Sequence, residues 1–203
     1  MGEIEKHYKA LMAQYRQATD DDKRESIRQE IWNTFGEKRA TLVTDMSGFT
    51  YLSHRYGSVH YLSMIEMMEE IVQDVVSSYQ GTVVKCEADN TFCIFEDPKL
   101  AINASIAINQ RLEVENRLLE EKFQVTLSCG IAYGTILVLE DEIYGQSVII
   151  ASKLGEDIAT KDEILVSKNC LDAAGGCGHL TLKPLTLEVS KVEVRCYYLE
   201  ATL

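Results

Sequence analysis

The feature that most constrains the fold is an alternation of strand-like and helix-like segments that begins near residue 39. Apolar residues at every second position predict strands, and apolar residues three and four positions apart predict helices. The pattern predicts strands at 40–46, 81–87, 90–95, 123–134, 135–139, 163–167, 180–188 and 191–199. It predicts helices within 49–79, from 97 to about 112, and at 148–159.

The predicted order of elements is β-α-α-β-β-α-β, followed by two further strands. This order favours an α+β fold in which helices cover one face of an antiparallel sheet, the ferredoxin-like arrangement with additions. A fold of this kind hosts many activities, so function has to be inferred from particular residues.

The first 36 residues have a different pattern, which predicts two helices. Apolar residues recur three and four apart, and the acidic segment at 19–22 supplies a helix N-terminus for the second helix. We therefore expect an N-terminal helical extension over 1–37 and a second unit over 38–203. The apolar stripe either packs on the chain's own core or forms a helical dimer contact, and Trp32 is expected to anchor the helices to the domain.

Charge bears on the choice of ligand. The 203 residues include 20 basic and 32 acidic side chains, which gives a formal net charge of −12. A protein that binds nucleic acid through its net charge needs clustered Lys and Arg, so we expect no nucleic-acid partner. A polyanionic substrate would need a metal ion to make its approach favourable.

Location and redox state follow from the hydropathy and the cysteines. No apolar run approaches 18 residues and the N-terminus lacks a signal-peptide layout, so we expect a cytoplasmic protein without a membrane anchor. The six scattered cysteines are expected to be reduced core residues. Cys177 and His179 form only half of a metal site, and His54 and His60 are expected at the surface or half-buried.

Two aspartates stand at positions suited to a metal and phosphate site. Asp45 ends a predicted strand, and the backbone N–H groups of residues 47–50 would begin the next helix without intrahelical partners, as phosphate-binding helix ends do. Asp89 lies on the turn of a neighbouring hairpin, where it could face Asp45 and share a Mg²⁺ or Mn²⁺ ion. Taken singly, Asp45 could equally be a helix N-cap and Asp89 a turn residue.

Five segments resemble, in order and spacing, the catalytic domain of the class III nucleotidyl cyclases. The resemblance covers about 40–170, and the segments are Asp45-Met-Ser-Gly-Phe-Thr50, Lys85-x-x-x-Asp89, Gly130-Ile-Ala-Tyr-Gly134, Gly145-x-x-Val148-x-x-Ala-Ser-Lys153-Leu154 and Ile164-Leu-Val-Ser167. Each segment alone is weakly specific, but the series of five is fairly specific.

The resemblance implies that the protein converts a nucleoside triphosphate to a 3′,5′-cyclic nucleotide and pyrophosphate in cyclic-nucleotide signalling. It assigns two Mg²⁺ or Mn²⁺ ions to Asp45 and Asp89, with the carbonyl of Met46 as a further ligand. One ion would activate the 3′-hydroxyl and the other would steady the triphosphate. Substrate contacts are expected from the four residues Ser47, Gly48, Phe49 and Thr50.

Base recognition, by the same resemblance, falls to Lys85 and Glu142. A lysine donor and a carboxylate acceptor suit adenine, although cytosine or guanine could use the same pair. ATP is favoured, because guanylyl-type members typically have Glu in place of Lys85. Outside this role, Lys85 would be a solvated strand residue and Glu142 part of an acidic loop.

The chain departs from the family pattern at several positions. Ile149 replaces an asparagine that contacts the ribose, and Lys153 replaces an arginine that stabilises the transition state, so the planar fork is lost. Ala88 replaces a glycine, a smaller concern if this residue keeps a negative φ. The segment 134–145 is short for the family's dimerisation arm. We therefore expect modest activity or an altered substrate.

The family builds its active sites across a dimer, so the resemblance implies a homodimer with two shared sites. One hypothesis is a metal-dependent cyclase that retains Asp45, Asp89 and Lys85. The other is a catalytically degenerate cyclase-like domain that acts as a regulatory or protein-binding module, favoured by Ile149 and Lys153. A nucleotide hydrolase that uses the same metal ions is a third possibility.

Overall fold

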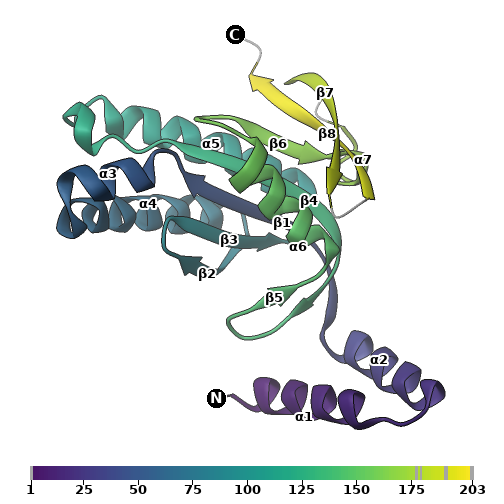
Figure 1. Cartoon of the computed structure of the whole chain (residues 1–203). Coiled ribbons are helices and arrows are strands. Elements are labelled where there is room, and N and C mark those ends of the chain that lie inside the picture. Colours follow the sequence, from purple (N-terminus) through teal and green to yellow (C-terminus); the bar gives the residue numbers. More distant parts are fainter. Residues whose placement is uncertain (1, 177, 179, 190–191, 202–203) are drawn as a thin grey trace.

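The computed structural model describes residues 2–176, 178, 180–189 and 192–201, which form one eight-stranded sheet with helices on both faces (Figure 1). Along the sheet the strands are ordered β2-β3-β1-β4-β6-β8-β7, and β5 pairs with β4. The strands are β1 (Gly36–Met46), β2 (Thr82–Glu87), β3 (Asn90–Phe95), β4 (Leu127–Val138), β5 (Ile143–Tyr144), β6 (Ile164–Ser167), β7 (Leu180–Val189) and β8 (Val192–Ala201). The α+β class expected from the sequence is confirmed.

All neighbouring strands are antiparallel except β4 and β6, which run parallel. The chain crosses between these two strands through α6 (Gln146–Ser152) and the π-helical segment η2 (Lys153–Ile158). A parallel pair requires such a crossover, because a tight turn can only reverse the chain direction. The crossover brings the 148–159 segment across the sheet.

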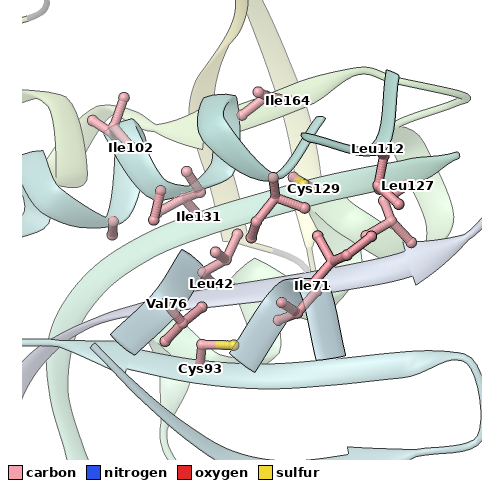
Figure 2. Close-up of a cluster of buried hydrophobic side chains, with 14 of the residues drawn as sticks. Leu42, Ile71, Val76, Cys93, Ile102, Leu112, Leu127, Cys129, Ile131 and Ile164 are labelled. Atoms are coloured by element: carbon pink, nitrogen blue, oxygen red, sulfur yellow. The ribbon is translucent and has the colours of Figure 1, made fainter. Parts of the chain in front are cut away.

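One face of the sheet is covered by α4 (Ser58–Ser78) and α5 (Pro98–Asn116), with α7 (Lys168–Ala173) beside them. Alternate residues of the strands point to this face and form the main hydrophobic core. Figure 2 shows part of this core, in which Leu42 and Ile131 from the strands lie among Ile71, Val76 and Ile102 from the helices. Asp97 caps α5 by accepting from the Lys99 amide at 2.8 Å, and Pro98 begins the helix, as predicted.

The opposite face is partly covered by α6 and η2. Its core contains Val43, Phe92 and Ala151, and Leu154 of η2 is buried in an adjoining cluster. The expectation that helices cover only one face is therefore wrong. The crossover between the parallel strands adds the second layer. The sequence pattern did not indicate on which face of the sheet α6 and η2 would lie.

The N-terminal segment forms two antiparallel helices, α1 (Glu3–Gln17) and α2 (Asp21–Phe35), which lie below the β5 hairpin in Figure 1. Asp20 caps α2 by accepting from the Lys23 amide at 2.7 Å, and the strand β1 starts directly at Gly36. The apolar stripe packs within the chain, where α1, α2, Leu137 and Leu139 form one cluster. Trp32 does not anchor it, since its side chain is 38% exposed and Phe35 occupies the cluster instead.

Several elements differ from the sequence prediction. The predicted strands 123–134 and 135–139 form the single strand β4, which begins only at Leu127 because η1 (Glu121–Phe123) and an extended segment precede it. The pair of helices predicted within 49–79 is present as α3 (Phe49–Tyr56) and α4. The short elements β5 and α7 were missed, because two to six residues are too few to show a period.

Of the five cysteines that the structure describes, all but one have the expected core placement. Cys93, Cys129, Cys170 and Cys196 are buried free thiols, whereas Cys86 is exposed. Cys177 and His179 lie outside the described residues. Among the helices of the described chain, none has the length and apolar content needed to span a membrane.

Candidate active site

The two aspartates singled out in the sequence lie at adjoining points of the sheet. Asp45 is near the end of β1, where it is paired in register with Asn90 at the start of β3. Asp89 lies on the turn between β2 and β3, and its carbonyl accepts a hydrogen bond from the Met46 amide at 3.2 Å. The antiparallel pairing of β1 with β3 therefore brings together two carboxylates that are 44 residues apart in the chain.

Electrostatics at this point disfavour the charged form of Asp45. Partial burial raises the pKa of the Asp45 carboxyl to about 6, and negative charge on Asp89, Glu156 and Asp157 adds to the effect. Burial also raises the pKa of Asp89. Asn90 partly compensates by donating its side-chain amide to Oδ1 of Asp45 at 2.8 Å and to the Thr44 carbonyl at 3.3 Å. Without a cation, these carboxylates repel one another.

The β2–β3 turn that carries Asp89 contains one residue, Ala88, with a strained backbone conformation. Ala88 has a φ of 53°, in the left-handed region that a side chain with Cβ disfavours. This alanine was expected to be a smaller concern only if it kept a negative φ, and its φ is positive. The glycine usual at this position in the family has a physical role here that alanine fulfils at some cost.

Replacing Ala88 by glycine is expected to stabilise the protein by about 1 kcal/mol, because glycine adopts a positive φ without strain. For a chain of this size, that corresponds to a rise in Tm of about 2–4 °C. Thermal unfolding checks the prediction, with Ala174→Gly as the control, since Ala174 has a φ of −72°. The control should lower Tm, and an equal rise in both variants would contradict the strain argument.

The helix that follows Asp45 only partly matches the expected phosphate-binding end. Gly48 adopts a φ of 82° and precedes α3, whose first residues are Phe49 and Thr50. The Ser47 amide is already used, since it donates to the Thr126 carbonyl at 3.0 Å. The Ser47 amide thus has a partner outside the helix and is not available to a phosphate, and the N–H groups expected to lack intrahelical partners are those of residues 48–50.

Lys85 and Glu142 are brought together from distant parts of the chain. Nζ of Lys85 donates to Oε2 of Glu142 at 3.0 Å and to Oε1 of Glu87 at 2.8 Å. It also lies 4.8 Å from the centroid of the Phe92 ring. Partial burial lowers the pKa of Lys85, but the hydrogen bonds to Glu87 and Glu142 outweigh it and leave the pKa raised. The lysine is thus a charged donor held by two carboxylates.

Asp45 and Lys85 lie on the same face of the sheet. Asp45 shares its face with Val43, and Val43 is paired in register with Phe92, which is paired with Lys85. Two strand spacings and two residues separate Lys85 from Asp45, which corresponds to about 12 Å. A nucleotide placed on this face could therefore contact both groups.

The crossover segment α6–η2 packs on this same face, and the backbone of η2 lies very close to the backbones of β4 and β1. Gly130 of β4 and Gly155 of η2 touch backbone to backbone, and a Cβ on Gly155 would lie 2.9 Å from both the Gly130 amide nitrogen and the Val43 carbonyl. This contact brings Glu156 and Asp157 close enough for their negative charge to raise the pKa of Asp45. The absence of side chains at the two glycines determines where the acidic end of η2 lies.

The two departures from the family pattern are both on this crossover. Ile149 is 47% exposed on α6, and Lys153 is half-exposed on η2, where its ammonium pairs with Asp157. The ion pair raises the pKa of Lys153. Neither side chain is buried within its own chain, so both are available to a second subunit or a substrate.

The donor chemistry fits a hard divalent cation. Asp45 and Asp89 supply carboxylate oxygens, the ligands that Mg²⁺ and Mn²⁺ prefer, and a cation would relieve their repulsion. In the described part of the chain, no group of three or more His, Cys, Asp or Glu side chains is arranged to hold a metal ion. Further ligands would have to come from backbone carbonyls, water or substrate phosphates.

Sequence reasoning missed four polar residues around the aspartates, namely Asn90, Glu87, Glu156 and Asp157. Glu87 and Asn90 flank the Ala88-Asp89 turn, so the hairpin prediction could have indicated them. Glu156 and Asp157 could not be assigned, because their position depends on the crossing of η2 over the sheet. The two histidines are placed as expected, with His54 exposed and His60 half-buried, where its Nε2 lies 2.8 Å from the Lys122 carbonyl.

No protein-family model matches the chain. Among curated proteins, the chain is 25% identical over 144 residues to "Putative adenylate cyclase 3" of Rhizobium meliloti. The aligned region covers 71% of this chain and 23% of that protein. The chain is 28% identical over 122 residues to "Adenylate cyclase" of Streptomyces coelicolor, which covers 60% of this chain and 30% of that protein. The chain thus spans less than a third of the length of these relatives.

Solved structures show the same fold. The adenylyl cyclase CyaB from P. aeruginosa matches with a TM-score of 0.72 at 18% identity, over 83% of this chain and 96% of that one. Together with the sequence relatives, this confirms the resemblance to the class III cyclase catalytic domains that the five segments indicated.

Proposed function

We propose that this chain, which has the fold of the class III nucleotidyl cyclase catalytic domains, is a metal-dependent nucleotidyl cyclase that acts on ATP. The proposal rests mainly on the convergence of Asp45 and Asp89 beside the first turn of α3. Their raised pKa values indicate a site that is incomplete without a cation. The same sheet face also carries the Lys85–Glu142 ion pair, a second polar group that a nucleotide could contact.

Asp45 and Asp89 would hold two Mg²⁺ or Mn²⁺ ions, with the Met46 carbonyl as a further ligand. When bound, the ions would favour ionisation of the ribose 3′-hydroxyl and neutralise charge on the triphosphate. The amides of residues 48–50 would bind phosphate oxygens at the start of α3. Cyclisation joins the 3′-oxygen to the α-phosphorus as the bond to the leaving pyrophosphate breaks.

Lys85 and Glu142 are proposed to recognise the base. Their ion pair has one donor and one acceptor group side by side, and adenine presents the complementary N1 acceptor and amino donor. Glu87 holds Lys85 from the other side and keeps its ammonium charged. This arrangement favours ATP over GTP, whose O6 and N1–H would have to engage the two groups with a shifted geometry.

A homodimer with two shared sites is proposed as the active form. In this arrangement one subunit supplies the metal residues, and the other supplies the base-recognition pair Lys85 and Glu142 together with Lys153. The exposure of Lys153 and Ile149 agrees with such a contact between subunits. Lys153 would place positive charge near the developing negative charge on the phosphate, but without the bidentate fork of arginine. Ile149 offers no hydrogen bond to the ribose, so we expect slow turnover.

The proposal is tested by incubating the purified chain separately with ATP, GTP, CTP and UTP in Mn²⁺ and separating the products by chromatography. We expect cyclic AMP and pyrophosphate from ATP, a smaller yield from GTP, and no product in EDTA. Linear diphosphate or monophosphate would indicate a nucleotide hydrolase. If no triphosphate gave any product, the remaining hypothesis would be a regulatory or protein-binding module. The departures from the family pattern at Ile149 and Lys153 favour that hypothesis.

A further inference from the structure

The proposed base-recognition residue Glu142 lies on a short hairpin that the N-terminal helices contact. The hairpin joins β4 to β5 through residues 139–142, and the Leu139 amide donates to the Glu142 carbonyl at 2.8 Å. Only two residue pairs, Leu137 with Tyr144 and Val138 with Ile143, connect its strands. A two-stranded hairpin this short has little stability of its own.

The pair α1–α2 packs on this hairpin through aromatic and aliphatic side chains. The ring of Tyr8 stacks on that of Tyr144, with centroids 6.3 Å apart and planes 11° from parallel. Tyr8 also contacts Phe35 of α2 edge to face at 5.8 Å. On the same face of the hairpin, Leu137 and Leu139 pack into the apolar cluster between the two helices.

A polar contact adds to the apolar ones. The carboxylate of Glu140, two residues before Glu142, lies against Gly2 at the N-terminus of α1. This end of α1 has no side-chain cap of its own, and a carboxylate is favourable at the positive end of a helix. The turn that presents Glu142 is thus held on one side by α1 and on the other by the ion pair with Lys85.

We propose that α1–α2 is a positioning element that sets the location of Glu142 relative to Lys85, with Tyr8 as its main contact. The inference rests on the proposed function, because it assigns a role to the residue that would recognise the base. Displacement of α1–α2 would free the hairpin and weaken nucleotide binding and base selectivity. The chemistry at Asp45 and Asp89 would be affected less.

The first test compares three variants of α1 by steady-state kinetics. Tyr8→Ala removes the ring that stacks on Tyr144, and we expect KM for ATP to rise about tenfold with kcat changed less than threefold. Tyr8→Phe keeps the ring and should behave as the original protein. Tyr15→Ala removes a ring from the same cluster about 10 Å further along α1, and it should lower Tm without raising KM.

A double-mutant cycle asks whether Tyr8 acts through Glu142. If it does, Tyr8→Ala combined with Glu142→Ala should raise KM no more than Glu142→Ala alone. A rise equal to the product of the two single effects would overturn the proposal. A general loss of folding would instead lower kcat in every combination.

Hydrogen–deuterium exchange provides a measurement that does not depend on turnover. Amides of residues 139–145 should exchange at least tenfold faster in Tyr8→Ala than in Tyr15→Ala, and unchanged exchange there would overturn the positioning role. If the original chain makes no cyclic nucleotide, the proposed function fails. The exchange comparison then still decides whether α1–α2 holds the hairpin.

Discussion

Replacing Asp45 by asparagine is expected to reduce cyclase activity about a thousandfold, on the scale of losing an electrostatic contact at the reacting atoms. The change keeps the side-chain shape but removes one of the two carboxylates proposed to hold the metal ions. The control is Asp97→Asn, because asparagine caps a helix as well as aspartate does and Asp97 lies at the start of α5. The control should keep full activity in the same assay with ATP and Mn²⁺.

The same variant should be more stable than the original protein when metal is chelated. The pKa of Asp45 is about 6 in the folded protein and 3.8 in the reference state. The contribution of Asp45 to the free energy of unfolding is therefore fully present below about pH 3.8 and is lost as pH rises through about 6. Because Asp45 is only partly buried, solvent screening reduces the expected gain in the free energy of unfolding at pH 7.5 to about 1 kcal/mol.

Denaturant unfolding in EDTA, repeated from pH 4 to pH 8, checks this part of the prediction. The stabilities of the two proteins should agree at pH 4 and separate towards pH 7. Adding Mn²⁺ should then stabilise the original protein but not Asp45→Asn, since a ligand stabilises only the state that binds it. A variant that is less stable in EDTA and still responds to Mn²⁺ would contradict the proposed metal role.

Mixing two inactive variants is expected to restore about a quarter of the original activity if each site is shared between subunits. One variant is Asp45→Asn, and the other combines Lys85→Ala with Lys153→Ala. Random exchange of equal amounts gives heterodimers for about half of the molecules, and each heterodimer has one intact site out of two. The recovered rate should follow the product of the two variants' fractions and be greatest at equal proportions.

Light scattering on each preparation accompanies the mixing experiment and should give twice the mass of one chain. Mixtures that stay as inactive as their components, although both variants form exchanging dimers, would place all site residues within one subunit. Asp45 and Lys85 of one chain lie about 12 Å apart on the same sheet face, so a site formed within one subunit is geometrically possible.

Much of the fold could be predicted because local signals and topology agreed. The helix caps at Asp20 and Asp97 and the hairpin around Asp89 have side chains that determine the backbone nearby. Lys85 and Glu142 were assigned to one site only through the family resemblance, and their ion pair was not predicted. No local pattern connects two residues that are 57 positions apart.

The features that escaped prediction depend on contacts between distant segments. The positive φ of Ala88 is set by the closure of the β2–β3 turn against β1, and alanine carries no signal for it. The approach of Glu156 and Asp157 to Asp45 depends on η2 crossing β1 and β4, and a π-helical segment has no distinct apolar period. The docking of α1–α2 on the β5 hairpin involves single contacts such as that of Tyr8 with Tyr144.

The backbone contact between Gly130 and Gly155 restricts how the site can move. With no side chains between them, η2 is already as near to β4 as two main chains can come, so the crossover cannot be pressed further inwards. Lifting it outwards would expose the buried Leu154 and Ala151 to water. The remaining low-energy motion is a slide of η2 along the strand direction, so we expect adjustment of the acidic end of η2 by shear rather than by hinge opening.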